Sequence, residues 1–596
     1  MKKHRYPHVS IKSIIYTLRI YHKAIGARSI FFIFYRIFES VLPSVNAILA
    51  GVTITTIAEA ISTHNIAPTM IFIAILLALK IIDVVLNTVN HLLSARIYED
   101  VYIYVSEQIS MKYLQVPLSV RESREFADKF DRVKDFTNSI PIITDSIIAV
   151  ASTVISLISV LIATSTVSPI ITIIVAISAV PSSILTVKLS ARRRHNWREY
   201  TKDRRIAWNI KNKILSSNNA LEIEMNNLGG HLVKKMIRHN RRSQEQDIKD
   251  ERSYLWPRFG SDIFETVATF GILSFVAIEI IFEKLEIGQF FTIRSLLTQL
   301  NISIFGLFNS VTSISENLIN ATDYMEFMEA PVKTSGNIKV LNTPTIEFRG
   351  VSFSYPNAKV KALDNISFKI NPGESLAIVG ENGAGKTTII KLLIGAYEPS
   401  EGVILIDEHP LTEINRESFL LQLGALFQEY SRYEFATLGE NVWFGNTSKK
   451  YNKKAIEIAL EQADLSTLAS NYDKGLDQIL SKDYDEHSTT DLSGGQWQRL
   501  AIARVLFRSP NVLLLDEPTS AIDAKSENKI FHNIFESQKG KTTIIISHRF
   551  STVRRATHII VLERGKLIES GTHEELIAKK RGVYKTLFEA QAKGYK

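Results

Sequence analysis

The chain has 596 residues, more than one hydrophobic core normally organises, so at least two domains are expected. It contains no cysteine, which excludes a disulfide framework, a thiolate nucleophile and a cysteine-based metal site. The net charge of +9 is compatible with nucleic-acid binding, but the basic runs lie beside apolar stretches. In that position the basic runs are better explained as signals of membrane orientation and as surfaces for anionic lipid headgroups. No nucleic-acid partner is therefore expected.

The first 330 residues contain six apolar runs, each close to the ~20 residues that cross a hydrocarbon core of ~30 Å. They lie at about 29–50, 68–91, 141–163, 167–188, 260–282 and 288–310. Helices buried inside a large soluble protein are the alternative interpretation. We predict that residues 1–330 are an α-helical transmembrane domain with six helices.

Lysine and arginine indicate how these helices are oriented. Residues 1–28 contain seven basic and no acidic residues, and residues 191–205 contain seven basic and two acidic residues. Both segments are therefore expected on the cytoplasmic side. Six crossings return the chain to that side, so the N-terminus and residues 345–596 are predicted to lie in the cytoplasm. The protein as a whole is predicted to lie in the cytoplasmic (inner) membrane. The first apolar run is too long for a cleavable signal peptide.

Two long connections join spans two to three and four to five, whereas the outer connections are short. Both are polar but helically patterned, so they are expected to extend the membrane helices into the cytoplasm. Each has a candidate contact element at its tip, at 121–133 and at 216–230.

Charged residues inside the predicted spans allow two interpretations. Arg36 with Glu39, and Lys80 with Asp83, are spaced so that each pair can neutralise itself on its own helix. Alternatively, these four form a polar belt around a cavity together with Asp145 and Glu265. The formal charge of that belt, −2, would suit a cationic or amphipathic cargo.

Residues 331–344 contain two prolines and a glycine without apolar periodicity, and are predicted to be a linker. Strand and helix patterns then alternate through residues 345–596, which indicates an α/β domain with a largely parallel sheet. Within it, "GENGAGKTT" at 380–388 follows an apolar strand and begins a helix. This arrangement is typical of a phosphate-binding loop.

Each residue type in this loop has a chemical role in binding phosphate. Gly380, Gly383 and Gly385 let backbone amides turn towards phosphate oxygens, and the helix N-terminus adds partial positive charge. Lys386 is predicted to reach the β- and γ-phosphates, and Thr387 to supply a hydroxyl to Mg²⁺.

Further candidates follow other apolar strands. In "NVLLLDEPTSAID" (511–523), Asp516 ends a strand and is placed to organise Mg²⁺, while Glu517 can polarise the attacking water. "TTIIISHRF" (542–550) delivers His548 to the same edge of the sheet, where we expect a γ-phosphate contact.

Two single residues complete this set. Gln428, after a short apolar strand, offers an amide oxygen to the metal or to water. Tyr355, ahead of the phosphate loop, is placed to stack on an adenine, or is an aromatic residue of the core.

The order of Tyr355, "GENGAGKT", Gln428, "LSGGQ", "LLLDEPTSAID" and His548 resembles the nucleotide-binding domain of ABC transporters across 345–596. The preceding membrane helices resemble the exporter branch of that family. The resemblance implies an α-helical transmembrane domain followed by an α/β P-loop NTPase domain, an ATPase coupled to transport, and ATP and Mg²⁺ as cofactors. The implied nucleotide contacts are Tyr355, Gly380, Glu381, Asn382, Gly383, Ala384, Gly385, Lys386, Thr387, Thr388, Gln428, Leu492, Ser493, Gly494, Gly495, Gln496 and Asp516.

In this family the "LSGGQ" segment of one domain covers the γ-phosphate of ATP held by the other domain. One chain carries one set of motifs, so the resemblance implies a second half-transporter. Degraded motifs are common in heterodimeric members, whereas Glu517, His548 and "LSGGQ" are all present here. A homodimer is therefore favoured, and a heterodimer remains the alternative.

Two local features bear on coupling and cargo. Exporters often carry a "GERG"-like stretch before "LSGGQ", but this chain has "KDYDEHSTTD" at 482–491, so coupling residues cannot be transferred from the family. Trp497 and "FQEYSRYEF" resemble exporters of lantibiotic and bacteriocin peptides. A peptide or amphipathic cargo is thus expected, with lipid or drug export, or a non-transporting ATP-gated regulator, as alternatives.

Overall fold

The structure is a computed structural model. It describes residues 11–594 apart from 168, most of 179–200, 217–218, 357, 482–491, 519–521 and 548. The chain divides into two compact units. Unit 1 comprises Met1–Leu114 with Ala127–Ala330, and unit 2 comprises Gln115–Phe126 with Pro331–Lys596.

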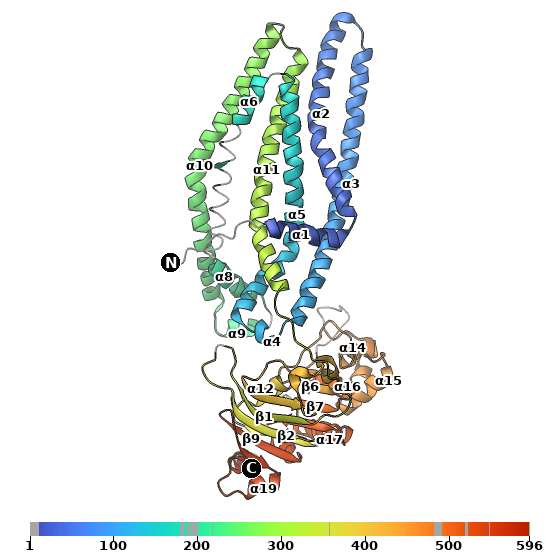
Figure 1. The fold of residues 1–596 in the computed structure, drawn as a ribbon, viewed down its shortest axis with the longest axis vertical. Coiled ribbons are helices and arrows are strands. Elements are labelled where there is room, and N and C mark those ends of the chain that lie inside the picture. The colour runs from blue at the N-terminus through green and yellow to red at the C-terminus, as the bar shows by residue number, and fades with distance from the viewer. Residues whose placement is uncertain are drawn as a thin grey trace. The chain divides into compact units, whose positions relative to one another are not determined.

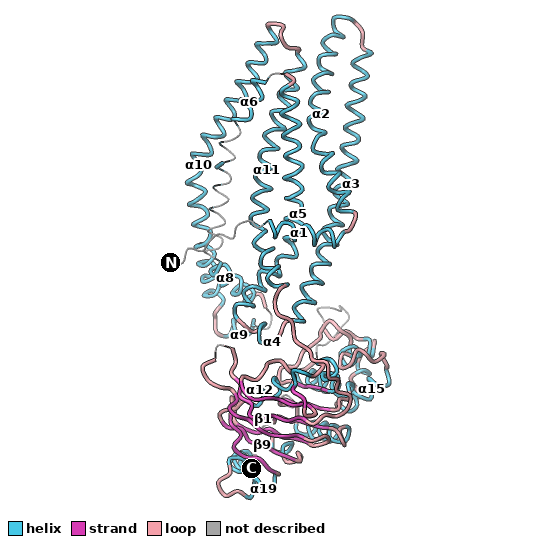
Figure 2. The backbone as a smooth tube through the Cα atoms, viewed as in Figure 1, coloured by secondary structure: helices cyan, strands magenta, loops and turns pink. Residues whose placement is uncertain are grey.

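The described part of unit 1 consists of helices and loops (Figures 1 and 2). Its helices are α1 (Ile11–Ile25), α2 (Arg28–Thr63), α3 (Ala67–Gln115), α5 (Arg124–Ser165), α6 (Pro169–Ser178), α8 (Thr201–Ile214), α9 (Ala220–Met225), α10 (Gly229–Ile281) and α11 (Ile287–Met328).

Five of these helices are long and apolar enough to cross a membrane: α2, α3, α5, α10 and α11. They contain the predicted spans 29–50, 68–91, 141–163, 260–282 and 288–310. The fourth predicted span, 167–188, is represented by α6 and a few later positions, and the rest of it lies outside the described residues. Several helices exceed the apolar runs: α3 has 49 residues, or about 74 Å at ~1.5 Å per residue.

Helices α2 and α11 approach each other closely at two glycines. A methyl group on Gly51 would lie 2.7 Å from the carbonyl oxygen of Gly288, and one on Gly288 would lie 2.0 Å from that of Gly51. Small residues allow such backbone contact between membrane helices. Around it, Ala47, Ile293 and Leu296 belong to an apolar core to which α5 and α10 also contribute.

The charged pairs in α2 and α3 neutralise themselves. Arg36 and Glu39 are 3.2 Å apart, and Lys80 and Asp83 are 2.6 Å apart, each pair on one helix. The self-pairing expected of these four residues is therefore observed.

Unit 2 contains all the described strands, in two sheets (Figure 2). A four-stranded antiparallel sheet has the order β2-β1-β4-β5, and a six-stranded sheet has the order β10-β9-β3-β8-β7-β6. The strands are β1 (Ile346–Phe353), β2 (Leu363–Ile370), β3 (Ser375–Gly380), β4 (Glu401–Ile406), β5 (His409–Pro410), β6 (Leu423–Leu426), β7 (Val512–Asp516), β8 (Thr542–Ile546), β9 (His558–Glu563) and β10 (Lys566–Gly571).

In the larger sheet β9, β3, β8, β7 and β6 are parallel, and only β10 is antiparallel. The helices of unit 2 are α4 (Leu118–Arg121), α12 (Lys386–Leu393), α13 (Arg416–Gln422), α14 (Leu438–Trp443), α15 (Lys453–Gln462), α16 (Gly494–Arg508), α17 (Ala524–Ser537), α18 (Phe550–Val553), α19 (His573–Ala578) and α20 (Val583–Gly594).

Both faces of the parallel sheet are buried, which explains the unbroken apolar runs in its strands. Successive side chains point to opposite faces, so Leu376 and Ile378 of β3 join a core with the antiparallel sheet, whereas Ala377 and Val379 join a second core on the other face. The predicted α/β domain with a largely parallel sheet is confirmed. The antiparallel sheet beside it was not predicted.

Helix α4 lies just ahead of the predicted contact element at 121–133 and ends at its first residue. The short helix begins earlier, at Leu118, directly after Pro117, and residues from Arg124 onwards already belong to α5. Leu118 packs against the core of unit 2, the hydroxyl of Tyr397 donates to the carboxylate of Glu122, and the Lys333 amide donates to the Gln115 carbonyl at 2.8 Å.

Trp497 lies in the helical core of unit 2, where its side chain is 3% exposed among residues of α14, α15 and α16. Replacing it with alanine should lower the free energy of unfolding of unit 2 by about 3–5 kcal/mol, because a large cavity is left. Urea-dependent proteolysis of the purified protein, read at cleavage sites in unit 2, measures this change. Phe435→Ala is the control, since Phe435 is 60% exposed, and an equal loss in both variants would contradict the assigned core role.

Candidate nucleotide site

The described site residues lie at the carboxyl ends of three parallel strands, β3, β7 and β6. These strands belong to one sheet, in which the order is β3, β8, β7, β6. Residues 380–385 follow β3, Glu517 follows β7, and Gln428 lies just beyond β6. Ligands of open α/β sheets bind at this edge.

The loop after β3 has the backbone that its glycines permit. Gly383 and Gly385 have φ values of 83° and 99°, in the left-handed region that side chains disfavour. A methyl group on Gly385 would also lie 2.6 Å from the carbonyl oxygen of Ala362. Gly385 is the residue before α12, so the loop delivers the N-terminus of that helix to the sheet edge.

Lys386 folds back over this loop. Its ammonium group donates to the carbonyl oxygens of Gly380 at 2.8 Å and Glu381 at 2.9 Å. Burial lowers the pKa of Lys386, while the carboxylates of Glu517 and Asp516 act in the opposite direction. The ammonium is thus held between the loop and two acids, where phosphate oxygens can replace the carbonyls as acceptors.

Asp516 and Thr387 are the candidate metal ligands of the site. Asp516 is 2% exposed at the end of β7, and burial raises the pKa of its carboxyl, an effect opposed by a hydrogen bond with Thr387. No cluster of three metal-binding His, Asp or Glu side chains occurs among the described residues. A hydroxyl and one carboxylate nevertheless fit Mg²⁺, which usually takes few protein ligands and completes its shell with phosphate and water.

Gln428 lies beside Glu517 in the structure. Its amide donates to the Glu517 carboxylate at 3.0 Å, which links the segment after β6 to that after β7. Glu517 has a positive φ of 49°, and its N–H donates to the Ile546 carbonyl of β8 at 2.9 Å. Backbone and side chain of Glu517 are thus both fixed by neighbouring strands.

Tyr355 packs as an aromatic residue of the core, which was the second interpretation of this residue. Its ring packs against the core between Phe353 and Tyr397, with centroids 5.0 and 5.4 Å away. Its hydroxyl lies 3.1 Å from that of Thr388 at the start of α12. The ammonium of Lys391 lies 5.4 Å from the ring centroid, a cation that the sequence did not single out. The predicted residue His548 lies outside the described residues.

The "LSGGQ" segment forms the start of α16. Ser493 is the N-cap, with its hydroxyl accepting from the Gln496 amide at 3.2 Å and its own amide donating to the Gln496 side chain at 2.8 Å. Leu492 is buried, whereas Ser493 and Gly494 are exposed, and a methyl group on Gly494 would meet nothing within 4 Å.

This segment lies apart from the phosphate loop of its own chain. Helix α16 packs against β6, and β6 is three strand spacings from β3, roughly 14 Å at ~4.8 Å per strand. Tyr430, which sequence reasoning missed, donates to the Gly494 carbonyl at 2.9 Å and so ties the Gln428 segment to α16. Its position two residues after Gln428 was the only available signal.

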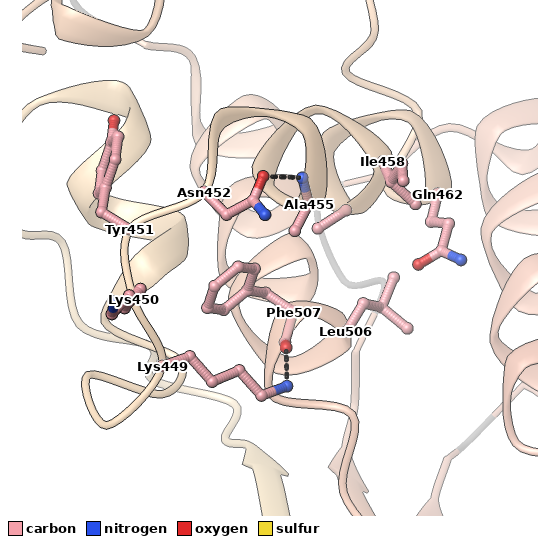
Figure 3. A pocket seen from close by; sticks show the side chains of 10 residues that line it. Lys449, Lys450, Tyr451, Asn452, Ala455, Ile458, Gln462, Leu506 and Phe507 are labelled. Atoms are coloured by element: carbon pink, nitrogen blue, oxygen red, sulfur yellow. Dashed lines mark hydrogen bonds between the residues drawn. The ribbon is translucent and has the colours of Figure 1, made fainter.

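A pocket of about 580 Å³ lies against the other end of α16 (Figure 3). None of the predicted nucleotide residues lines it. Lys449 donates to the carbonyl oxygens of Phe507 at 3.1 Å and Arg508 at 3.3 Å, which satisfies the end of the helix. We therefore do not consider this pocket a nucleotide-binding site.

Comparison with known proteins agrees with this geometry. Residues 363–520 match the family model of ABC transporters. The subtilin transport ATP-binding protein SpaT of Bacillus subtilis is 34% identical over 401 residues, 66% of this chain and 64% of that protein. The ATP-dependent lipid A-core flippase of Bordetella avium is 34% identical over 310 residues, 52% of this chain and 51% of that protein. The chain thus spans less than two thirds of these relatives.

The structure of a bacterial Atm1-family ABC exporter with ATP bound has a similar fold. The TM-score is 0.80, with 22% sequence identity over 95% of this chain and 99% of that chain. Residues 363–520 thus match the ABC transporter domain, and the fold of the chain is that of this ABC exporter structure. In that fold, one helical membrane-type domain is fused to one nucleotide-binding domain, which confirms the predicted fold class.

Proposed function

We propose that the protein is an ATP-driven exporter that hydrolyses ATP at the carboxyl edge of its parallel sheet. The observation that supports this most directly is the convergence of Lys386, the Thr387–Asp516 pair and the Glu517–Gln428 pair at that edge. A phosphate loop alone would serve for binding. Hydrolysis also requires a carboxylate that is fixed beside this loop and can accept a proton from the attacking water, as Glu517 is placed to do.

Each residue then has a stated role. The amides of residues 380–388 and the Lys386 ammonium bind the β- and γ-phosphates, and Tyr355 supports the adenine. Thr387, Gln428 and Asp516 would hold Mg²⁺, whose charge neutralises the transferring phosphoryl group. Glu517 takes the proton of the attacking water, and His548 contacts the γ-phosphate.

The site is completed by a second copy of the chain. Ser493 and Gly494 are exposed at the start of α16, a helix that packs against β6, and β6 is three strands away from β3 and its phosphate loop. In the proposed dimer, they cover the γ-phosphate held by the partner. Because Glu517 and "LSGGQ" are intact, we favour two identical chains, and a different half-transporter is the alternative.

Closure of this dimer on ATP would switch the membrane helices between inward- and outward-facing access, and hydrolysis would reset them. The distribution of lysine and arginine supports a cytoplasmic N-terminus and nucleotide-binding domain in the cytoplasmic membrane. The short helices α4 and α9, at the tips of the long helices, are the elements that would transmit closure.

A peptide is the favoured cargo. SpaT is named for subtilin transport, and its 401 aligned residues exceed what residues 345–596 can contain, so the similarity reaches well into the membrane half. The lipid A-core flippase alignment, over 310 residues, extends less far. Lipid or drug export and a non-transporting regulator remain the alternatives.

The experiment is reconstitution into vesicles with the nucleotide-binding domain outside. We expect a cationic amphipathic peptide to accumulate inside only with ATP, and to stimulate hydrolysis. Transport of a headgroup-labelled lipid instead would favour the flippase alternative, and flux without ATP consumption would favour the regulator.

The same assay tests the charges of the membrane half. Because Glu39 and Asp83 are already paired with Arg36 and Lys80, we expect the variant Glu39→Gln, Asp83→Asn to change transport of a cationic peptide less than twofold. A loss tenfold or larger would show that these carboxylates contact the cargo.

A further inference from the structure

We propose that the start of α2 and the middle of α3 form a binding site for the phosphate of an anionic phospholipid. The site is a pocket of about 400 Å³ lined by Arg28, Leu93, Arg96 and Ile97, within unit 1. It is separate from the nucleotide edge, and it rests on the membrane orientation proposed above.

The two arginines of the pocket differ in their contacts. Arg28 is fixed, because its guanidinium donates to the Asp100 carboxylate at 2.7 Å and to the Ile25 carbonyl at 3.3 Å. Arg96 lies one turn before Asp100 on α3, is exposed, and has no hydrogen-bond or ion-pair partner among the described residues. Asp100 balances one of the two cations, so one positive charge remains for a ligand.

The chemistry of that ligand follows from the pair of guanidinium groups. Two arginines on neighbouring helices present planar forks of N–H donors, a geometry that suits phosphate oxygens. The remaining lining, Leu93 and Ile97, is apolar and offers no acceptor or donor from its side chains. An anion with an adjoining apolar part therefore fits better than a fully hydrated ion.

The depth of the pocket favours a lipid headgroup. Arg28 immediately precedes the apolar run 29–50, and Arg96 follows the run 68–91 by about 7–8 Å at ~1.5 Å per residue. The headgroup layer extends roughly 5–8 Å beyond the hydrocarbon on each side. In the proposed orientation this is the cytoplasmic leaflet, which carries the anionic lipids.

An exposed apolar row continues from the pocket along α3. Val89, Val85 and Ile82 follow Leu93 at intervals of three or four residues, so all lie on one face, and they are 39%, 54% and 43% exposed. Phe31 of α2 is 60% exposed one turn beyond Arg28. Acyl chains lying along this row would place their phosphate at Arg96 and Arg28, whereas free phosphate would gain nothing from it.

The test counts phosphatidylglycerol molecules that remain on the full-length protein, by native mass spectrometry after extraction from vesicles of phosphatidylglycerol and phosphatidylcholine. Arg96→Gln should lower retention about fivefold, because one basic residue near the surface is lost. Arg96→Lys keeps the charge but not the fork, and should give an intermediate value. Arg19→Gln is the matched control, since Arg19 is exposed on α1 and does not line the pocket.

Three results would overturn the proposal. Equal losses in Arg96→Gln and Arg19→Gln would indicate diffuse attraction to the surface, and unchanged retention in Arg96→Gln would exclude the site. Displacement of the lipid by millimolar inorganic phosphate would assign the pocket to a free anion. No ATP is added, so lipid retention is measured independently of export. A protein that retains lipid but does not export supports the lipid site and contradicts the proposed function. A protein that exports but retains no lipid does the reverse.

Discussion

A chain with glutamine in place of Glu517 is expected to bind ATP as the native chain does, while its turnover falls by about 10²–10⁴-fold. The substitution keeps the size of the side chain and removes only the carboxylate that accepts a proton from water. Gln428 can still donate to the new amide oxygen, and the backbone bond to Ile546 does not involve the side chain. The phosphate loop, Lys386 and Asp516 are unchanged, so binding should persist.

Binding of a fluorescent ATP analogue and steady-state phosphate release separate the two effects. Glu429→Gln is the matched control, because Glu429 lies next to Gln428 in the sequence, is exposed, and has no role in the proposed site. Turnover of Glu517→Gln within a few fold of the native value would contradict the assignment. A loss of ATP binding would instead indicate that Glu517 supports the loop.

The second large effect concerns which chain completes each site. We expect Lys386→Met and Gly494→Asp each to abolish hydrolysis in a homodimer. Lys386→Met removes the ammonium at the phosphates. Gly494→Asp adds a negative charge near the γ-phosphate of the partner, but fits its own fold, because a side chain there meets nothing within 4 Å and aspartate is favourable at a helix N-terminus.

Mixing the two variants should restore activity. In a dimer of one Lys386→Met chain and one Gly494→Asp chain, one site carries both defects and the other carries none. Dimers isolated with two different affinity tags should therefore hydrolyse ATP at up to roughly half the native rate, if one intact site turns over independently.

The reciprocal dimer is the control. A chain with both substitutions, paired with a native chain, has one defect in each shared site and should be inactive. If each chain instead used its own "LSGGQ" segment, this second dimer would be active and the first inactive. The pair of measurements thus tests whether the "LSGGQ" segment acts on the nucleotide of its own chain or on that of its partner.

The parts of the site that depend on local chain chemistry were predictable from the sequence. The glycines of the phosphate loop have the positive φ values that such a turn requires, and Asp516 ends a buried strand as the apolar run indicated. Parallel pairing then places the ends of separate strands at one edge, which brings Lys386, Asp516, Glu517 and Gln428 together.

Contacts set by tertiary packing were not predictable. The hydrogen bond from the Gln428 amide nitrogen to Glu517 was not predicted, because the neighbouring strands β6 and β7 fix the positions of the two side chains. The bond from Tyr430 to Gly494 joins segments 64 residues apart, which no local pattern encodes. The start of α4 at Leu118 was missed because a four-residue helix gives no measurable periodicity.

The assignment of residues 115–126 to unit 2 has a consequence for how the protein is made. Glu122 and its partner Tyr397 are separated by 275 residues, so roughly 14–55 s of synthesis pass between them at ~5–20 residues per second. During that interval α4 lacks the surface on which Leu118 packs. Unit 2 is therefore completed only after the membrane half has left the ribosome, and a fragment beginning at residue 331 would lack one of its own helices.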